Sequence, residues 1–293
     1  MRKNKFFNDE KIFVFINYLI LTLLGIMALY PFLYVLGASL SSGRAVDTGR
    51  VTLFPVEFTI DAYIHVFKDN QFWISYANTL FYTFVGTLYS MVLTSMGAYA
   101  LSKKKLMFRR ELNLFVAFTM WFNAGMIPTY LNLRDLGFID SRLGIIMAFG
   151  MQAFNIILLR NYFEGVPEAI DEAATIDGAN EFKKFFKIYL PLSKPALVTV
   201  ALFYAIGRWN GFFWTMILIR DTNKISLQVY LRTLIIDKAN AAEEIANNLL
   251  SLSYSYDTLI YAIIVCSMIP VILVYPYIQK YFTKGIMVGG VKE

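Results

Sequence analysis

The chain has 293 residues, of which 57% are hydrophobic and only 16% are charged, and its formal net charge is +6. Soluble domains are about 45–50% apolar and about 25% charged, so this composition excludes an ordinary soluble protein and favours a polytopic membrane protein. The basic residues flank the apolar runs, which argues against a nucleic-acid partner. One cysteine, Cys266, and one histidine, His65, provide neither an intrachain disulfide nor an expected metal site.

Six charge-poor windows approach or exceed the length of about 20 residues that a helix needs to cross a bilayer. The first is too long for a signal-peptide core and lacks a clear cleavage site, so it is interpreted as a retained span. The sequence therefore predicts an all-α, polytopic fold with six transmembrane helices. In chain order the windows are Ile12–Gly43, Asn70–Ser102, Leu112–Leu133, Leu143–Leu159, Pro195–Ile219 and Thr258–Gln279.

Six spans put both termini on one side of the membrane, and the side with more Lys and Arg is cytoplasmic. Of the 27 Lys and Arg residues, 17 lie on the side of the termini. We therefore expect both termini in the cytoplasm, with a six-span domain at residues 12–280. The cytoplasmic parts are the N-terminal segment 1–11, a polar loop at 161–194 and a tail at 281–293.

The two larger outer loops are expected at residues 41–69 and 220–257. The second contains Asp237–Leu250, whose composition favours a short helix at the outer surface.

The polar loop has the local signals of two short helices with a sharp turn between them. Pro167 suits the first helical position, and Gly178 suits a left-handed stop. Asn180 can cap a second helix, which Pro191 can end.

The first of these helices has a small apolar face, with Ala169, Ala173 and Ile176 at helical spacing. Its other face is polar. Such a helix can dock into a partner protein or pack on its own spans, and periodicity alone leaves both interpretations open. The polar face contains Glu168, Asp171, Glu172 and Thr175.

At full spacing, Glu172-Ala173-Ala174, Gly178, Ile188 and Leu190-Pro191 resemble the cytoplasmic signature of bacterial ABC importer permeases. Three further stretches resemble carbohydrate-uptake permeases, in particular the maltose-type second permease and an oligosaccharide or aldouronate-like branch. Gly211 and the long loop 220–257 depart from that pattern and leave the substrate open. The three stretches are Asn78–Lys105, Trp209–Trp214 and Tyr281–Glu293.

The resemblance implies a type I ABC importer permease fold in the bacterial plasma membrane, forming half of a path for a sugar or oligosaccharide. It implies a second related permease that forms a heterodimer with this chain, two ATPase subunits and an extracytoplasmic solute-binding protein. A same-type permease for an amino acid or phosphonate is the alternative.

The sequence has no G-x-x-x-x-G-K-[ST] phosphate loop. We therefore expect no enzyme activity and no cofactor in this chain, and we expect ATP and Mg to bind to the partner ATPases. The resemblance implies ATPase coupling through Glu168, Asp171, Glu172, Ala173, Ala174, Asp177 and Gly178.

The translocation path is less sharply indicated. Thr79, Thr83, Thr87, Ser90 and Thr94 form one hydroxyl stripe, which either packs against another helix or lines a sugar path.

Arg208 lies near the middle of the fifth window, where an intramembrane charge costs about 2.5–3.5 kcal/mol on insertion scales. It either binds substrate hydroxyls or a carboxylate, or makes a structural ion-pair or carbonyl contact. The substrate-path candidates are Asn78, Tyr82, Thr83, Tyr204, Arg208, Trp209 and Asn210.

Two other function classes are disfavoured. A membrane enzyme needs a convergent acid, base or metal set, and a proton-coupled carrier needs an intramembrane Asp, Glu or His. No such residue lies within a predicted span.

Overall fold

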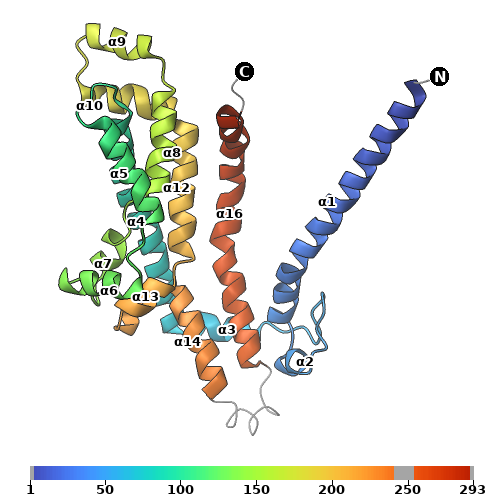
Figure 1. The fold of residues 1–293 in the computed structure, drawn as a ribbon. Coiled ribbons are helices and arrows are strands. Elements are labelled where there is room, and N and C mark those ends of the chain that lie inside the picture. The colour runs from blue at the N-terminus through green and yellow to red at the C-terminus, as the bar shows by residue number, and fades with distance from the viewer. Residues whose placement is uncertain (1–2, 241–253, 291–293) are drawn as a thin grey trace. The chain divides into compact units, whose positions relative to one another are not determined.

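The computed structural model describes residues 3–240 and 254–290, and these are helices joined by turns and loops (Figure 1). The chain divides into two compact units. Unit 1 contains Met1–Asn70 and Leu231–Ile269, and unit 2 contains Gln71–Tyr230 and Pro270–Glu293.

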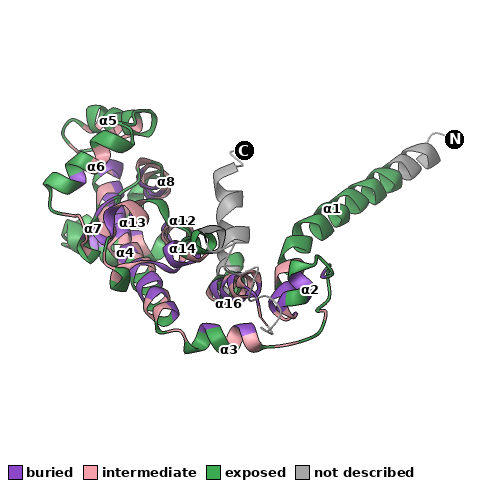
Figure 2. Cartoon of the chain, turned by 90° about the horizontal axis from the view of Figure 1, so that it is seen from below, coloured by how far each residue is buried: buried purple, intermediate pink, exposed green. Residues whose placement is uncertain are grey.

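Unit 1 is built on one long helix and a small core beside its C-terminal end. The large apolar side chains of α1 from Ile12 to Leu33 are exposed, as expected for a span in contact with lipid or a partner, and the helix is drawn mostly green in Figure 2. The core contains Ala38, Ala45, Val46 and Val51. The helices of this unit are α1 (Lys3–Ser39), α2 (Gly43–Asp47), α3 (Asp61–Lys68) and the unit's parts of α14 (Leu227–Asn240) and α16 (Tyr256–Gly290).

Unit 2 is organised around α4, α8 and α12, whose buried side chains form the main core, including Ala98, Leu159 and Val200. In Figure 1, α9 and α10 lie at one end of these helices, and α6, α7 and α13 lie at the other. The helices are α4 (Asn70–Ser102), α5 (Arg109–Trp121), α6 (Met126–Asp135), α7 (Arg142–Met147), α8 (Ala153–Glu164), α9 (Glu168–Ile176), α10 (Glu181–Lys184), a π turn (Phe185–Tyr189), α11 (Leu190–Leu192), α12 (Lys194–Trp209), α13 (Phe213–Leu218) and a 3-10 turn (Thr222–Lys224).

The second predicted span matches α4 residue for residue, and the first and last correspond to α1 and α16. Among the described residues, three helices are long and apolar enough to cross a membrane, or up to five spans if each of two bent helix pairs counts as one. The helix α16 continues to Gly290, so most of the expected tail 281–293 is helical. The helix expected at Asp237–Leu250 falls largely on residues 241–253, outside the described residues, although α14 reaches Asn240.

The third, fourth and fifth predicted spans are interrupted rather than continuous, and a left-handed backbone residue lies at two of the three breaks. Between α5 and α6 the chain bends by 116°; Gly125 has φ +87°, and Pro128 lacks the N–H that would continue the helix. Between α7 and α8, Phe149 adopts φ +59°, a left-handed conformation that no α-helix contains. Between α12 and α13 the break follows Asn210.

Candidate functional site

The polar loop forms the expected helix, turn and helix. Pro167 stands at the N-cap of α9, one residue before the predicted position. Gly178 makes the turn with φ +72°, and the Asn180 side chain accepts a hydrogen bond of 2.9 Å from the Lys183 N–H. The predictions for Gly178 and Asn180 are therefore confirmed, whereas Pro167 lies at the N-cap and not at the first helical position.

The prediction that Pro191 ends the second helix is wrong. The helical path continues from α10 through the π turn into α11, and it ends at Ser193, where the chain bends by 84° before α12. In the π turn the Leu190 N–H donates to the Phe185 carbonyl, so the helical turn is wider than in an α-helix. Pro191 falls in the short α11 that follows this turn.

The residues expected to couple to an ATPase divide between two faces of α9. Asp171 is half-buried, and Ala174 is the buried residue of this helix. The neighbouring Ile176 side chain is 86% exposed, which is unusual for a large apolar residue. The exposed members of the predicted set are Glu168, Glu172, Ala173, Asp177 and Gly178.

Asp171 lies at the centre of a group of charged and phenolic side chains that we call the Asp171 cluster. One Asp171 oxygen, Oδ1, accepts from Lys103 Nζ at 2.7 Å and from the Tyr189 hydroxyl at 2.9 Å. The other, Oδ2, accepts from Lys184 Nζ at 3.1 Å. Lys184 is only 3% exposed, and its Nζ also donates to Thr175 at 2.8 Å. The members of the cluster are Tyr99, Lys103, Asp171, Glu181, Lys184 and Tyr189.

These contacts fix the charge state of the cluster. Burial alone would raise the pKa of Asp171, but the hydrogen bonds from Lys103, Lys184 and Tyr189 lower it to about 2. For Lys103, burial lowers the pKa, but the hydrogen bonds to Asp171 and to the two tyrosines outweigh this and raise it. Two Lys and two carboxylates are therefore charged together at neutral pH, which satisfies the rule that a buried charge needs a partner.

At the other end of unit 2, a cavity of about 430 Å³ is lined by aromatic, hydroxyl and amide side chains. This volume lies in the range of about 300–1,000 Å³ that is typical of ligand pockets. Of the predicted path residues, Tyr82, Tyr204, Arg208 and Asn210 line it. Gln152 also lines it, and its backbone N–H donates to the Tyr204 hydroxyl at 3.0 Å.

The Arg208 guanidinium joins three elements of unit 2. It donates to the Ile145 and Ile146 carbonyls at 3.1 and 3.0 Å, and to the Ser90 hydroxyl at 2.9 Å. The two carbonyls belong to the last turn of α7, which has no following turn to accept from. The guanidinium also lies against Gly86, where an added Cβ would clash with it.

Asn78 and Tyr82 hold the segment 222–227, which includes the 3-10 turn. The Asn78 amide donates to the Asn223 and Ile225 carbonyls at 2.9 and 3.0 Å. The Tyr82 hydroxyl donates to the Lys224 carbonyl at 2.7 Å. Both side chains are buried, and the Asn78 amide nitrogen and the Tyr82 hydroxyl are bonded to backbone carbonyls.

The hydroxyl stripe of α4 faces protein along most of its length. Thr79, Ser90 and Thr94 are at most 1% exposed, and Thr94 shares a 2.7 Å hydrogen bond with Tyr204. The hydroxyl oxygens of Thr83 and Thr87 are buried without a hydrogen-bond partner among the described residues. The stripe thus resembles a helix-packing face more than an open polar path.

Trp209, another predicted path residue, is 6% exposed and packs edge-on against Tyr76, with ring centroids 6.1 Å apart. It is absent from the cavity lining, as are Asn78 and Thr83. The predicted path residues therefore lie in one end of unit 2, but only four of the seven line the cavity.

Sequence reasoning missed the roles of Lys103, Lys184 and Tyr189. The run Lys103-Lys104-Lys105 was counted only among the basic residues that set the membrane orientation. The pairing of Lys103 with Asp171, 68 positions later, has no local sequence signature. In the part of the chain that the structure describes, no group of three or more His, Cys, Asp or Glu could hold a metal ion.

Comparison with known proteins identifies the class. The chain belongs to the family of binding-protein-dependent transport system inner membrane components, which matches residues 12–288. It is therefore a membrane-embedded permease subunit of an ABC importer and a transport component rather than an enzyme, as the resemblance implied. The type I permease fold is confirmed by the same match.

Its relatives include carbohydrate permeases. The chain is 38% identical to the polygalacturonan/rhamnogalacturonan transport system permease of Bacillus subtilis, over 97% of this chain and 99% of the relative. It is 28% identical to an arabinooligosaccharides permease of the same organism, over 92% of each chain. A chain from the crystal structure of a bacterial ABC transporter that imports the acidic polysaccharide alginate is 52% identical, with a TM-score of 0.87, and the match covers 94% of this chain and 98% of that one. The expected resemblance to carbohydrate-uptake permeases is confirmed.

Proposed function

We propose that this permease forms half of the translocation path for an acidic oligosaccharide, in particular one built from uronate units. The observation that carries the proposal is the 52% identity, over 94% of the chain, to a chain of the alginate importer. The similarity to the polygalacturonan/rhamnogalacturonan permease supports the same substrate class. The second permease, the two ATPases with their ATP and Mg, and the external binding protein would complete the importer.

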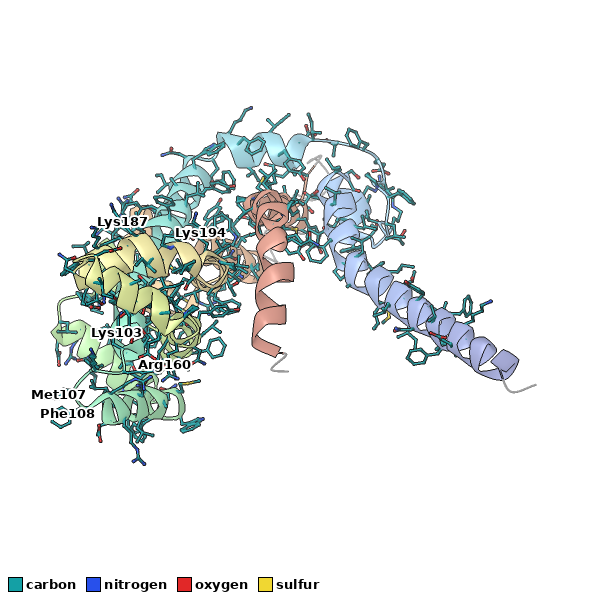
Figure 3. All side chains as sticks on the ribbon, turned by 90° about the horizontal axis from the view of Figure 1, so that it is seen from above. Lys103, Met107, Phe108, Arg160, Lys187 and Lys194 are labelled. Atoms are coloured by element: carbon teal, nitrogen blue, oxygen red, sulfur yellow. The ribbon has the colours of Figure 1, made fainter. Side chains whose placement is uncertain are left out.

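The end of unit 2 that carries α9 is proposed to face the cytoplasm, together with both termini. Figure 3 looks onto that end and labels Lys103, Arg160, Lys187 and Lys194, which come from separate parts of the sequence. Basic residues at one end of a membrane domain favour the cytoplasmic side.

On that side, α9 is proposed to dock into an ATPase subunit through its exposed face. Glu172 and Ala173 are exposed there, and the exposed side chain of Ile176 offers apolar surface beside them. Closure of the two ATPases on ATP would then move the docked helices and switch the permease pair between inward-facing and outward-facing states.

The cavity is the proposed sugar contact on this subunit, with Asn210 as the candidate polar contact. The Tyr204 hydroxyl already bonds to Thr94 and to the Gln152 N–H, so Tyr204 is proposed to shape the cavity wall. Arg208 is proposed to act mainly as a brace, because its guanidinium donates to the α7 carbonyls and to Ser90. Its positive charge still lies beside the cavity, where it would favour an anionic sugar. Asn78, Thr83 and Trp209 are proposed to have structural roles.

The test of the substrate is to purify the chain with its native partners, reconstitute the complex in proteoliposomes and add the external binding protein loaded with different oligosaccharides. We expect oligouronates to stimulate ATP hydrolysis and neutral oligosaccharides of equal length to have little effect. Equal stimulation by neutral sugars would contradict the acidic class, and a chain that purifies alone and transports without ATP would contradict the importer assignment.

The test of docking is Glu172→Lys, which reverses a charge on the exposed face of α9. We expect the variant to remain in the membrane, to lose ATPase subunits on purification and to lose uptake. Normal co-purification together with normal uptake would show that α9 does not dock through this face.

A further inference from the structure

The attachment of α9 to the rest of unit 2 rests on few contacts. It has nine residues, and Ala174 is its buried residue. Burial of one alanine side chain contributes little, since apolar burial is worth about 25 cal/mol per Å². The position of the helix therefore depends on polar contacts more than a typical packed helix does.

Two ion pairs join α9 to the end of α4, and their environments differ. Asp171 pairs with Lys103 at 2.7 Å, and the two side chains are 26% and 22% exposed. Glu168 pairs with Lys104 at 2.6 Å, and these side chains are 63% and 73% exposed. An exposed pair is worth about 0–1 kcal/mol, whereas a partly buried pair is screened less. The inner pair is thus the stronger candidate for a mechanical link.

The inner pair is also tied to a third element. Lys184 of α10 holds the second Asp171 oxygen, and Tyr189 of the π turn donates to the first. The Lys103 ammonium lies 4.5 and 4.2 Å from the ring centroids of Tyr99 and Tyr189, where cation–π attraction adds to the hold. Asp171 is thereby fixed between α4 and the helical path that leads into α12.

The far end of α4 holds the segment 222–227 through Asn78 and Tyr82. A displacement of α9 that is passed to α4 would therefore reach that segment, because α4 is an unbroken helix of 33 residues.

We propose that Asp171 is a positioning residue that joins the ATPase-docking helix α9 to span α4 through Lys103, so that the two move as one body. The inference rests on the proposed docking of α9. In this proposal Asp171 is not part of the docking surface. Its role is to transmit the movement of the docked helix α9 to the transmembrane helix α4.

The test compares Asp171→Asn and Lys103→Met with the matched control Lys104→Met, which breaks the exposed pair between the same two segments. The complete transporter, with both permeases and both ATPases, is reconstituted in proteoliposomes, and substrate uptake and ATP hydrolysis are measured with loaded binding protein. We expect Asp171→Asn and Lys103→Met to retain the ATPase subunits and ATP hydrolysis while uptake per ATP falls about tenfold. Lys104→Met is expected to keep the wild-type ratio.

A double variant tests whether the two residues act through each other. Asp171→Asn combined with Lys103→Met is expected to be no worse than either single variant, since both remove one link. If Asp171→Asn does not accumulate in the membrane, Lys103→Met carries the test, because it removes the same 2.7 Å pair and leaves Lys184 on Asp171.

A rescue experiment separates a mechanical link from a merely structural one. Cysteines replace Lys104 and Glu168 in the Asp171→Asn background, with Cys266 replaced by Ser, and a short bifunctional thiol reagent joins them. Restored uptake per ATP is the expected result.

Three outcomes would overturn the inference. They are a wild-type ratio in Asp171→Asn, loss of the ATPase subunits from that variant, and failure of the cross-link to restore uptake. Failure of the docking proposal is recognised separately, by normal co-purification and uptake of Glu172→Lys.

Discussion

The two ends of α4 are held by different chemistry. At one end Lys103 joins α9 through ion pairs between side chains. At the other end Asn78 and Tyr82 donate to backbone carbonyls of the segment 222–227. A side-chain ion pair depends on the identity of both residues, whereas a bond to a carbonyl holds the chain whatever side chain the residue carries. The charged end is therefore more sensitive to substitution on both sides of the contact.

The largest effect is expected from reversing the central charge of the charged end. Asp171→Lys places a third ammonium beside Lys103 and the nearly buried Lys184. Breaking a buried ion pair costs about 3–5 kcal/mol, so the thermal midpoint of the assembled transporter should fall steeply, or the chain should fail to accumulate. Asp135→Lys, at a side chain 66% exposed, is the control and should change the midpoint little. A normal midpoint for Asp171→Lys would show that the cluster does not hold α9.

A smaller effect is expected at the neutral end. Asn78→Ala removes the donor of two hydrogen bonds and leaves the Asn223 and Ile225 carbonyls without it. A buried polar group left unsatisfied costs about 1–3 kcal/mol. The thermal midpoint should fall accordingly. The ATPase subunits should remain bound through α9, because Asn78 lies at the other end of α4. The exposed Asn132→Ala is the control, and equal midpoints for the two variants would contradict the assigned contacts.

Removing one hydroxyl should have less effect again. Tyr82→Phe keeps the ring and loses the hydrogen bond to the Lys224 carbonyl, and one such bond is worth about 0.5–1.5 kcal/mol. Proteolysis of the 222–227 segment should become faster, with a small shift of the midpoint. Unchanged proteolysis and an unchanged midpoint would show that Asn78, and not the Tyr82 hydroxyl, holds the segment 222–227 in place.

The smallest effect concerns pH. The pKa of Asp171 is lowered to about 2 in the folded protein, against about 3.9 in an unfolded chain. A depressed carboxyl pKa stabilises the folded state above the unfolded value, and this contribution is lost as pH falls from about 4 towards 2. Difference infrared spectra of wild type against Asp171→Asn should show the carboxylate band unchanged from pH 8 to pH 5. Protonation near pH 5 would contradict the charge state of the cluster.

Sequence patterns predicted the continuous elements well and the interrupted ones poorly. The bounds of α4 follow from an uncharged run between Asp69 and Lys103, and the α9 turn follows from Gly178 and Asn180, all of which are local signals. The break after α7 depends instead on Phe149 in a left-handed conformation and on the distant Arg208. The Arg208 guanidinium donates to the α7 carbonyls that a further helical turn would otherwise satisfy. Hydropathy does not detect such contacts.

For the site, the loop was predictable and the inner face of its helix was not. Spacing grouped Asp171 with Glu168 and Glu172 on one polar face, but the structure turns Asp171 inward to Lys103. The choice of face depends on where α4 ends relative to α9, which is tertiary information. The structure places the predicted path residues at one end of unit 2, but periodicity did not show that Asn78 and Tyr82 donate to backbone carbonyls.

The π turn sets the phase of the helical path that leaves the polar loop. In an α-helix, residues five apart point about 140° away from each other, whereas in a π turn the i→i+5 hydrogen bonds align them. Lys184 and Tyr189 are five apart and both reach Asp171. The turn therefore acts as a one-residue insertion in an otherwise α-helical register. Any redesign that deletes one residue between them would rotate one of these donors away and would have to supply another.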